Sequence, residues 1–360
     1  MITDYNEIIN LLENINPIKY AKDRNFIDGS VSRISPYISR GIISTKQVYK
    51  FLIKKGYSLK NIQKFVQEMV WREFWQITWQ NNNIDKDLKH IQKDVEFYGF
   101  PSIIINHNTQ INAIDKSIKE LYYSGYMHNH LRMYVASLCT NILNYHWKLP
   151  AKWMYYHLLD GDWGSNSLSW QWVCGANSNK KYYANQDNIN RFTKSNQKNT
   201  ILDTSYDEFL NIKCERKLTK KYSLELNVNY PKSDKFLNKI QKPICIYNYY
   251  NLDVNWRKSL DAHRILLIEP SIFKQYPISD IAMKFMIDLS KNIKNIKIFV
   301  GEFNELPINK SKVYFKEHPL NYNYIGTEDS REWIYKPKIV YKSFFKHWNT
   351  VIKQLYLNPL

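Results

Sequence analysis

Residues 160–172 read DGDWGSNSLSWQW and bring polar and aromatic side chains together in one short segment. Asp160 and Asp162 place two carboxylates close together, and Asn166 adds an amide four residues beyond the second carboxylate. Two tryptophans then flank Gln171. Because Asp is a favoured helix N-cap, the segment predicts a helix that begins after Asp162 and carries core tryptophans. This structural interpretation needs no ligand.

A second segment, MHNHLRM at residues 127–133, predicts a helix face of mixed polarity. Helical spacing puts Asn129, Arg132 and Met133 on the same face as Ala136. A guanidinium among small and apolar residues needs a buried partner, and we expect Asp160 to be the ion-pair partner of Arg132. A structural salt bridge would account for this pair without any function.

A third segment, EMVWREFW, places four large side chains at helical spacing. Glu68, Trp71, Arg72 and Trp75 recur at i, i+3, i+4 and i+7, so that a carboxylate, a guanidinium and two indoles share one stripe. Taken alone, this stripe is typical of an ordinary amphipathic helix.

A fourth segment, SRISPY at residues 32–37, places hydroxyls and an arginine before a helix start. Ser35 is expected to cap this helix, because a proline follows at the first helical position. Free amides at such an N-terminus suit a phosphate group, although a capped helix is the simpler interpretation.

The pattern around these segments is helical from Asp4 to about Trp172, with no strand-like alternation. Asp4, Ser44 and Ser58 are predicted N-caps. Predicted helices include one from Ser58 through Trp79, one from Tyr122 to about Asn144 and one from Lys152 to Leu159.

The pattern changes after a polar stretch that contains a basic cluster at Lys217, Lys220 and Lys221, which is typical of a solvated segment. Short buried strands are then predicted at 243–247, 264–268, 296–300 and 313–315, with helices at 279–293 and 343–355. This alternation indicates an α/β layer with a largely parallel sheet. The segment contains neither GxGxxG nor GxxxxGK[ST], so no motif supports nucleotide binding there.

The predicted fold class is therefore a multi-domain α and α/β protein. We expect an all-helical domain at 1–195, a polar linker at 196–240 and a small, Rossmann-like α/β domain at 241–360.

Composition favours a polyanionic partner and argues against a metal site. The 360 residues carry a formal net charge of +18, which favours nucleic acid, although a chain rich in Lys, Asn and Ile can also reflect compositional drift. The cysteines show no CxxC spacing, so buried free thiols are expected rather than zinc or disulfides, at Cys139, Cys174, Cys214 and Cys245. With no run of 18 apolar residues and no secretory signal, a cytoplasmic protein is expected.

Together, the four segments resemble the FAD-binding domain of the DNA photolyase/cryptochrome family. The resemblance runs from about Tyr20 to Phe192, in the family's order and roughly its spacing. It implies a helical domain around a U-shaped FAD, whose photoexcited reduced flavin passes an electron to a pyrimidine dimer flipped out of DNA. The pair Asn129 and Met133 is similar to the residues of the photolyases that act on cyclobutane dimers. The (6-4) photolyases carry histidines at these two positions.

The resemblance implies three groups of site residues. The FAD phosphates and their surroundings would be held by Tyr20, Ser32, Arg33, Ile34 and Ser35. The flavin would be surrounded by Arg72, Arg132, Asp160, Asp162 and Asn166, with Asn166 facing N5 and an arginine favouring the anionic reduced ring. The dimer pocket would comprise Glu68, Trp71, Asn129, Met133 and Trp172, the two indoles serving as flat walls for unstacked bases.

Several positions depart from the family pattern. Val31 stands where the family usually has Thr, and His130 replaces an arginine that contacts the DNA backbone. Trp170 and Trp147 match the first two members of the family's electron relay. No tryptophan lies between Asp94 and Ile105 to serve as the third, and the aromatic residues there are Phe97, Tyr98 and Phe100. The α/β domain follows the flavin domain, so the usual N-terminal antenna domain is expected to be lacking, and the antenna chromophore is left open.

The resemblance therefore predicts a deoxyribodipyrimidine photo-lyase: a monomeric flavoprotein, not bound to a membrane, that repairs cyclobutane pyrimidine dimers in DNA. One alternative is a cryptochrome-like blue-light photoreceptor, or a DNA-binding flavoprotein, without repair activity. Another is a redox-silent FAD scaffold whose α/β domain binds a protein partner. The complete set of dimer-pocket residues favours repair, whereas His130 and the expected lack of an N-terminal domain favour the alternatives.

Overall fold

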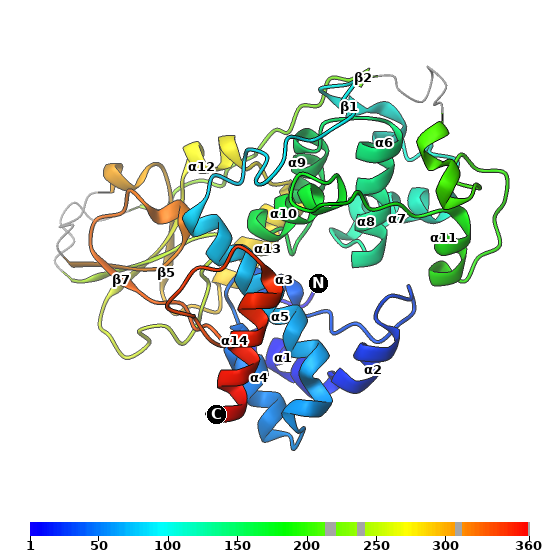
Figure 1. The fold of residues 1–360 in the computed structure, drawn as a ribbon. Helices are drawn as coiled ribbons and strands as arrows, with labels where there is room; N and C mark the ends of the chain where they lie inside the picture. Colours follow the sequence, from blue (N-terminus) through cyan, green and yellow to red (C-terminus); the bar gives the residue numbers. More distant parts are fainter. Residues whose placement is uncertain (213–220, 236–241, 307–311, 359–360) are drawn as a thin grey trace. The chain divides into compact units, whose positions relative to one another are not determined.

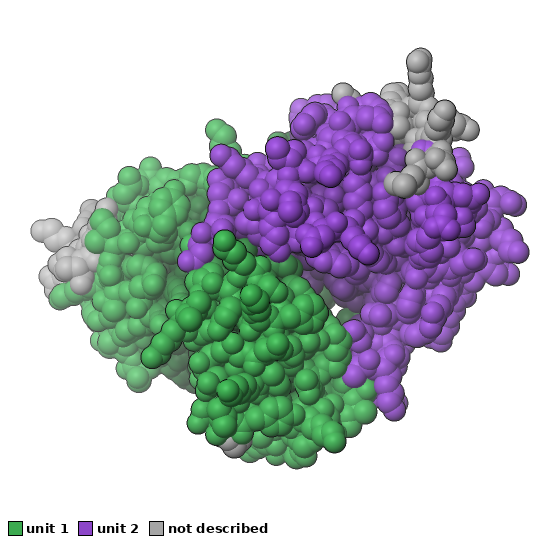
Figure 2. Space-filling view, in the orientation of Figure 1, with its two compact units in different colours: residues 1–18, 32–80, 227–360 green, residues 19–31, 81–226 purple. Residues whose placement is uncertain are grey.

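The computed structural model describes residues 1–212, 221–235, 242–306 and 312–358. The chain forms two compact units, which Figure 2 shows in different colours. Unit 1 comprises residues 1–18, 32–80 and 227–360, and unit 2 comprises residues 19–31 and 81–226. Each unit collects the segments that pack against one another, whether or not they are consecutive in the sequence. The limits predicted from the sequence, at 195 and 240, remain predictions about independently folding parts of the chain.

The N-terminal helices of unit 1 begin where the sequence predicts caps. Asp4 accepts hydrogen bonds from the backbone N–H groups of Asn6 and Glu7, and Ser44 forms a capping box with Gln47. Ser58 accepts a bond from the backbone of Asn61 at 3.4 Å. The elements of this part are α1 (Tyr5–Asn10), η1 (Leu11–Asn14), α3 (Ser35–Ser39), α4 (Thr45–Lys54) and α5 (Leu59–Asn81). The helix α2 (Pro17–Asp23) begins in unit 1 but has most of its residues in unit 2.

The predicted capping role of Ser35 is wrong by one residue. Ile34 occupies the N-cap position of α3, and Ser35 is the first helical residue. The N-cap side chain makes no capping hydrogen bond because isoleucine has no acceptor. Pro36 lies in the first turn of α3, as predicted. A proline is tolerated there because the N–H that it lacks would have no partner within the helix.

The α/β part of unit 1 is a five-stranded sheet in which every strand pairing is parallel, as predicted. Its order is β5-β4-β3-β6-β7, so the chain runs from β3 to one edge and then returns to build the other. The strands are β3 (Ile244–Tyr247), β4 (His263–Ile268), β5 (Ile296–Val300), β6 (Val313–Lys316) and β7 (Thr327–Asp329). The sequence missed only β7, which is short and exposed in its first two residues.

Both faces of the central strands are buried. Ile244, Ile246 and Val313 belong to one core cluster, and the alternate residues Cys245 and Tyr247 are buried on the other face. Burial on both faces is the usual state of a parallel sheet and explains the unbroken apolar strands in the sequence. The helices of this part are α12 (Pro270–Gln275), α13 (Asp280–Ser290) and α14 (Phe344–Leu357).

Within unit 1, the turn between α3 and α4 packs against the loop that follows β3. Gly41 has φ +68°, and a Cβ at this position would lie 2.7 Å from the carbonyl oxygen of Tyr250. The backbone N–H of Leu252 donates to the carbonyl of Arg40 at 2.8 Å. The Arg40 guanidinium lies over the Tyr249 ring at 3.3 Å. The N-terminal helices and the sheet therefore share one packed interior.

Unit 2 is built mainly from helices, of which α10 packs against both α8 and α9 (Figure 1). Its elements are α6 (Ser102–Ile105), α7 (Asn112–Ser124), α8 (Asn129–Ser137), the π-helical turn η2 (Leu138–Ile142), α9 (Lys148–His157), α10 (Trp163–Val173), α11 (Gln186–Thr193) and the 3-10 helix η3 (Tyr206–Asn211). A two-residue strand, β1 (Phe100–Pro101), pairs with β2 (Lys221–Tyr222), which the helical pattern did not predict.

The prediction of one helix from Tyr122 to Asn144 is wrong. Gly125 ends α7 with φ +68°, and a Cβ there would lie 2.5 Å from the Leu159 side chain, so the chain turns before α8 begins. The apolar periodicity continues through this break because both helices bury the same kind of face. The helix predicted to begin at Lys152 starts earlier, at Lys148.

Three of the four cysteines are buried free thiols, as predicted, and Cys214 lies outside the described residues. Burial raises the pKa of Cys174 to about 12 and that of Cys245 to about 11, so both are protonated at neutral pH. Among the residues that the structure describes, no group of His, Cys, Asp or Glu could hold a metal ion. No helix in the same residues has the length and apolar character to span a membrane. Lys217 and Lys220 of the predicted basic cluster also lie outside the described residues.

Candidate functional site

The structure confirms the cap at the start of α10, but of the two tryptophans that flank Gln171 only Trp170 is in the core, since Trp172 is exposed. Asp162 occupies the N-cap position, and its Oδ1 accepts from the backbone N–H of Ser165 at 2.7 Å. Trp163 and Trp170 are buried, so these indoles belong to the core of unit 2. The cap fixes the first turn, and the two tryptophans hold the helix against its neighbours.

Arg132 on α8 and Asp160 form the predicted ion pair. Nη2 of Arg132 donates to both carboxylate oxygens of Asp160 at 3.0 Å, and Nε donates to the carbonyl of Met127 at 2.8 Å. The carboxylate is almost fully buried and the guanidinium is largely buried. A charge pair with good hydrogen-bond geometry compensates the loss of water, so the positive group is held at a defined place.

Asn166 presents an oriented acceptor on the first turn of α10. Its Nδ2 donates to the carbonyl of Ala151 at 2.7 Å. Because a carbonyl oxygen only accepts, this contact fixes which end of the amide is nitrogen and leaves Oδ1 as an acceptor. The hydroxyl of Ser165 is buried and has no hydrogen-bond partner within the described residues. An acceptor amide and an unsatisfied hydroxyl therefore lie on the same helix turn as the Asp162 cap.

These groups of unit 2 suit a flavin ring. A flavin presents N–H donors and carbonyl acceptors at its edge, and its reduced form is anionic near an arginine. Asn166 Oδ1 can accept from the ring, Ser165 can donate or accept, and Arg132 supplies the positive charge. The residues present thus fit the cofactor that the resemblance implies.

Three residues predicted for a dimer pocket are accessible in unit 2. Asn129 is exposed and Met133 is half-buried, both on α8. Trp172 on α10 is 39% exposed, unlike the other tryptophans of its helix, and its ring lies 5.8 Å from that of Tyr182. An exposed tryptophan ring is unusual for core packing, and Asn129 and Met133 are also accessible, so all three side chains remain candidates for ligand contact.

His130, the predicted DNA contact, is neutral near neutral pH. Burial, together with the nearby charges of His128 and Arg24, lowers its pKa to about 4. Its ring stacks on Phe192 with 4.5 Å between centroids. The side chain can therefore give a phosphate a hydrogen bond but no charge, whereas the usual arginine would give both.

In unit 1, Trp71 is stacked face to face on Phe344 of α14. The ring centroids are 3.4 Å apart and the planes differ by 9°. Phe74 and Trp75 pack beside the same indole, at 6.0 and 4.9 Å. One face of Trp71 is therefore covered by a helix from the far end of the chain, and no local sequence signal pointed to Phe344.

The other predicted residues of unit 1 lie in two places. Glu68 pairs with Lys64 at 2.8 Å on the half-exposed side of α5. Arg72, one turn later, donates to the hydroxyl of Ser39 at the end of α3. The residues assigned to the FAD phosphates precede α3: Ser32 is half-buried, Arg33 is exposed with φ +56°, Ile34 is buried and Ser35 is half-buried.

Tyr20, the remaining phosphate-site residue, belongs to unit 2 and lies on α2. It is half-buried, with the Arg24 guanidinium 5.8 Å from its ring centroid. Tyr20 is in unit 2, whereas the residues directly before α3 are in unit 1. Their shared role in holding the FAD phosphates therefore stays a prediction.

A line of stacked rings runs from the core of unit 2 to its surface. Trp147 is buried, and its ring lies 6.4 Å from that of Trp163. His146 stacks between Trp147, at 5.7 Å, and Tyr98, at 5.4 Å. Tyr98 is 74% exposed, so this line ends at solvent. Sequence reasoning named Trp147 and Tyr98 but missed Trp163 and His146.

The other two aromatic candidates for the end of the relay do not reach this line. Phe97 packs on Tyr145 at 5.1 Å, and Phe100 is buried against Trp153. Trp170 is buried on α10, and its place in the relay stays a prediction.

Comparison with known proteins finds the same family that the four sequence segments resemble. The family model of the FAD-binding domain of DNA photolyase matches residues 60–206. A deoxyribodipyrimidine photo-lyase of Alkalihalophilus pseudofirmus is 25% identical over 240 residues, which covers 59% of this chain and 48% of that protein. A protein of the same name from Buchnera aphidicola subsp. Acyrthosiphon pisum is 30% identical over 190 residues, which covers 46% of this chain and 37% of that protein.

Among solved structures, a bacterial class III photolyase from Agrobacterium tumefaciens is 24% identical, with a TM-score of 0.41, and the match covers 52% of this chain and 44% of that one. A cryptochrome from Synechocystis sp. PCC6803 is 18% identical, with a TM-score of 0.42, over 52% of this chain and 43% of that one. The chain spans less than half the length of each of these relatives.

Proposed function

Because this chain belongs to the DNA photolyase/cryptochrome family through its FAD-binding domain, we propose that it is a light-driven lyase that splits cyclobutane pyrimidine dimers in DNA. The proposal rests on the match at residues 60–206 and on the flavin-compatible groups of α8 and α10. FAD, when bound, supplies light absorption and the electron that starts dimer cleavage.

The observation that carries the proposal is the arrangement of Arg132, Asp160 and Asn166. The ion pair fixes a guanidinium whose charge favours an anionic ring beside it. Asn166 is anchored through Nδ2, so its Oδ1 is the atom left to accept a hydrogen bond from a ring N–H. Asp162 is occupied as a cap and orients the helix turn that carries Asn166.

Substrate recognition is assigned to the accessible side chains. Trp172 offers a flat apolar face to an unstacked base, and Asn129 and Met133 give an amide and a thioether on α8. The resemblance adds Trp71 and the Glu68 carboxylate, which would hydrogen-bond the polar edge of the dimer. Asn129 and Met133 favour cyclobutane dimers over (6-4) products, since histidines at these two positions mark the latter class.

Two findings favour the second candidate, a cryptochrome-like photoreceptor or DNA-binding flavoprotein without repair activity. Phe344 covers one face of Trp71, and His130 is neutral where a cationic phosphate contact is expected. Both features weaken DNA contacts while leaving the groups assigned to FAD intact.

The decisive experiment has two steps. Purified protein is first tested for a flavin absorption spectrum, with FAD added if none is present. The loaded protein, with its flavin reduced, is then illuminated with DNA that contains cyclobutane dimers, and intact pyrimidines are counted against a dark control. Flavin binding with light-dependent repair supports the lyase. Flavin binding without repair supports the second candidate, and failure to bind FAD overturns both.

A further inference from the structure

The indole of Trp147 is hydrogen-bonded to a carboxylate inside unit 2. Its Nε1–H donates to Oδ1 of Asp87 at 2.6 Å, and the indole is fully buried. The other oxygen, Oδ2, accepts from the backbone N–H of Gln92 at 2.8 Å. Both oxygens therefore act as acceptors, as they do in an ionised carboxylate. The side chain of Asp87 is only 17% exposed, so little water competes for these contacts.

The loop that carries Asp87 is held in place by a buried amide of α10. Oε1 of Gln171 accepts from the backbone N–H of Leu88 at 2.9 Å. Nε2 of the same side chain donates to the carbonyls of Ile84 and Lys86, at 2.9 and 3.2 Å. A buried polar group that is bonded at both ends makes its surroundings rigid, so the carboxylate keeps a defined position.

Gln92 ties the carboxylate and the indole to one support. Its backbone N–H donates to Asp87, and its Oε1 accepts from the backbone N–H of Trp147 at 2.9 Å. Its Nε2 donates to the carbonyl of Tyr145 at 3.0 Å. The donor and the acceptor of the short hydrogen bond are therefore positioned by the same side chain.

The neighbouring imidazole of His146 does not offset the charge of this carboxylate. Its Nδ1 accepts from the backbone N–H of Lys148 at 3.3 Å, so in the neutral ring the proton is on Nε2. Nε2 lies 3.8 Å from Oδ1 of Asp87. Burial lowers the pKa of His146, although the nearby carboxylate acts in the opposite direction. The ring is therefore neutral at neutral pH.

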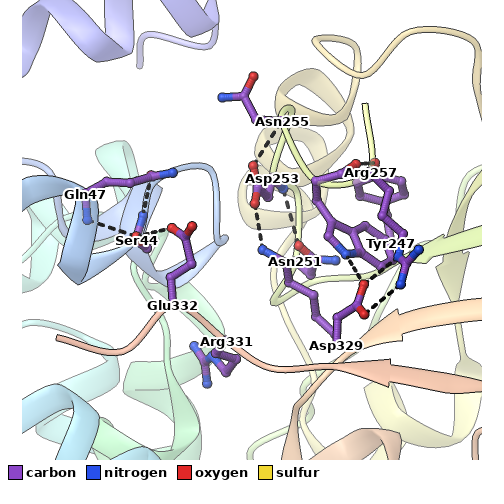
Figure 3. Close-up of polar contacts among 12 residues, drawn as sticks. Ser44, Gln47, Tyr247, Asn251, Asp253, Asn255, Arg257, Asp329, Arg331 and Glu332 are labelled. Carbon is purple, nitrogen blue, oxygen red and sulfur yellow. Dashed lines mark hydrogen bonds and ion pairs between the residues drawn. The ribbon is translucent and has the colours of Figure 1, made fainter. Parts of the chain in front are cut away.

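Unit 1 contains an indole–carboxylate contact of a different kind. Nε1 of Trp256 donates to Oδ2 of Asp329 at 2.8 Å. Arg257 donates to both oxygens of that carboxylate (Figure 3). Hydrogen bonds from this guanidinium hold the pKa of Asp329 below its usual value. A carboxylate with such a partner is a poor proton acceptor, because the positive charge favours its ionised form.

A second contact in unit 1 also includes a cation. Nε1 of Trp333 donates to Oε2 of Glu317 at 3.2 Å, and Lys336 donates to the same carboxylate. In the part of the chain that the structure describes, Asp87 has no arginine or lysine as an ion-pair partner. Among these three carboxylates, Asp87 is therefore the one best suited to take a proton from its indole.

We propose that Asp87 is the proton acceptor of Trp147 when light drives an electron through the aromatic relay. Loss of one electron toward the oxidised FAD leaves Trp147 as an indole radical cation, which is a far stronger acid than the indole. The Nε1–H bond then breaks and an Oδ1–H bond forms, which leaves a neutral indole radical beside a neutral carboxylic acid. When an external thiol returns one electron, the proton moves back to Nε1. At 2.6 Å the two atoms are already within reach for this transfer.

The transfer removes two charges from a buried place. A positive charge on the fully buried indole is costly in surroundings of low polarity, and the negative charge of Asp87 offsets it only while both persist. Once the proton has moved, the electron can return only if the proton also moves back, so the reverse step is slow. The inference rests on the proposed function for the bound FAD and the relay, whereas dimer splitting by flavin that is already reduced needs no relay.

The test is transient absorption after a laser pulse on protein loaded with oxidised FAD. Every sample carries Tyr98→Phe, which removes the exposed end of the relay and keeps the radical on tryptophan. The radical cation and the neutral radical of tryptophan have different spectra. We expect this background to form the neutral radical, more slowly in heavy water. Adding Asp87→Asn should abolish the neutral radical and shorten the lifetime of the cation, because an amide accepts the hydrogen bond but not the proton.

The control is Asp187→Asn at an exposed carboxylate of unit 2, which should behave like the background. A neutral radical that persists in Asp87→Asn overturns the inference, and so does the absence of any tryptophan radical in the background protein. Repair of dimer-containing DNA by chemically reduced protein is measured in parallel. Repair without the neutral radical overturns only this inference, whereas the radical without repair overturns only the proposed lyase.

A second measurement needs neither light nor cofactor. In protein with isotope-labelled tryptophan, the indole proton of Trp147 should resonate far downfield, as expected for a short hydrogen bond to a carboxylate. Trp147→Phe identifies this resonance, and Asp87→Asn should move it upfield while Asp187→Asn leaves it in place. If Asp87→Asn does not fold, the wild-type spectrum decides, since an indole proton of Trp147 at an ordinary position overturns the inference.

Discussion

Nη2 of Arg132 donates to both carboxylate oxygens of Asp160 at 3.0 Å and so ties α8 to the segment that leads into α10. The Nε group of the same arginine is held by the carbonyl of Met127. Two anchors on one guanidinium leave little freedom for its charge. This rigidity suits a group that must keep a constant field on a bound ring.

Replacement of that carboxylate should release the cofactor. We expect Asp160→Asn to lose most of its bound FAD and to lower the free energy of unfolding by about 1–3 kcal/mol, because the guanidinium loses its counter-charge while largely buried. Flavin absorbance per protein and urea unfolding measure the two effects. Asp187→Asn, at an exposed carboxylate on α11, is the control. Full FAD occupancy in Asp160→Asn would contradict the assigned role.

Trp71 should matter for DNA and not for flavin. Trp71→Ala is expected to weaken binding of dimer-containing DNA by about 1–3 kcal/mol, the value of one base-stacking face, with the FAD spectrum unchanged. Phe344→Ala is the matched control, since it uncovers that face of Trp71 and should lower stability without weakening DNA binding. If Trp71→Ala strips the flavin and leaves DNA affinity as it was, the allocation of this helix face is wrong.

The line of rings through His146 predicts where electrons enter. Light-driven reduction of bound FAD, with an external thiol, should slow in Trp170→Phe and in Tyr98→Phe. Tyr98 is the exposed end of the line, and a phenylalanine cannot be oxidised in its place. Tyr123→Phe, at another exposed tyrosine of unit 2, should behave like the wild type. Photoreduction that stays fast in Trp170→Phe would show that this tryptophan serves only the core.

Glu269 should make unit 1 less stable as the pH rises. Burial raises its pKa to about 7, although hydrogen bonds from Tyr324 and the backbone of Phe303 act in the opposite direction. The folded state therefore favours the protonated form, and this contribution is full below about pH 4.5 and is lost as the pH rises through about 7. Urea unfolding across this range should show a loss of up to about 3 kcal/mol from this group.

Two variants check the assignment of this pH dependence. Glu269→Gln should remove the share of the pH dependence that this group contributes, because glutamine keeps the shape of the protonated acid without titrating. A remaining slope is expected from Glu73, whose pKa burial also raises to about 7. Glu120→Gln, at an exposed glutamate of unit 2, should leave the profile unchanged. An unaltered pH profile in Glu269→Gln would assign the effect to another group.

Local patterns in the sequence were sufficient to predict many of the elements and one ion pair, but not the break at Gly125 or the short strand β7. Asp4 and Ser44 cap helices because capping depends on a few neighbouring residues. The apolar runs that became β3 to β6 predicted a parallel sheet because strands buried on both faces cannot alternate. The Arg132–Asp160 pair followed from charge, since a guanidinium on a partly apolar helix face needs a carboxylate.

Only the tertiary structure decided which of these elements share a surface. The Ile334 backbone donates to Glu73 across 261 residues of sequence, Phe344 stacks on Trp71, and His146 joins Trp147 to Tyr98. Periodicity identifies the face that a helix buries but not the partner that covers it, because any apolar face offers similar burial energy. The partner is chosen by packing over the whole chain, and so is the carboxylate of Asp87 that meets the Trp147 indole.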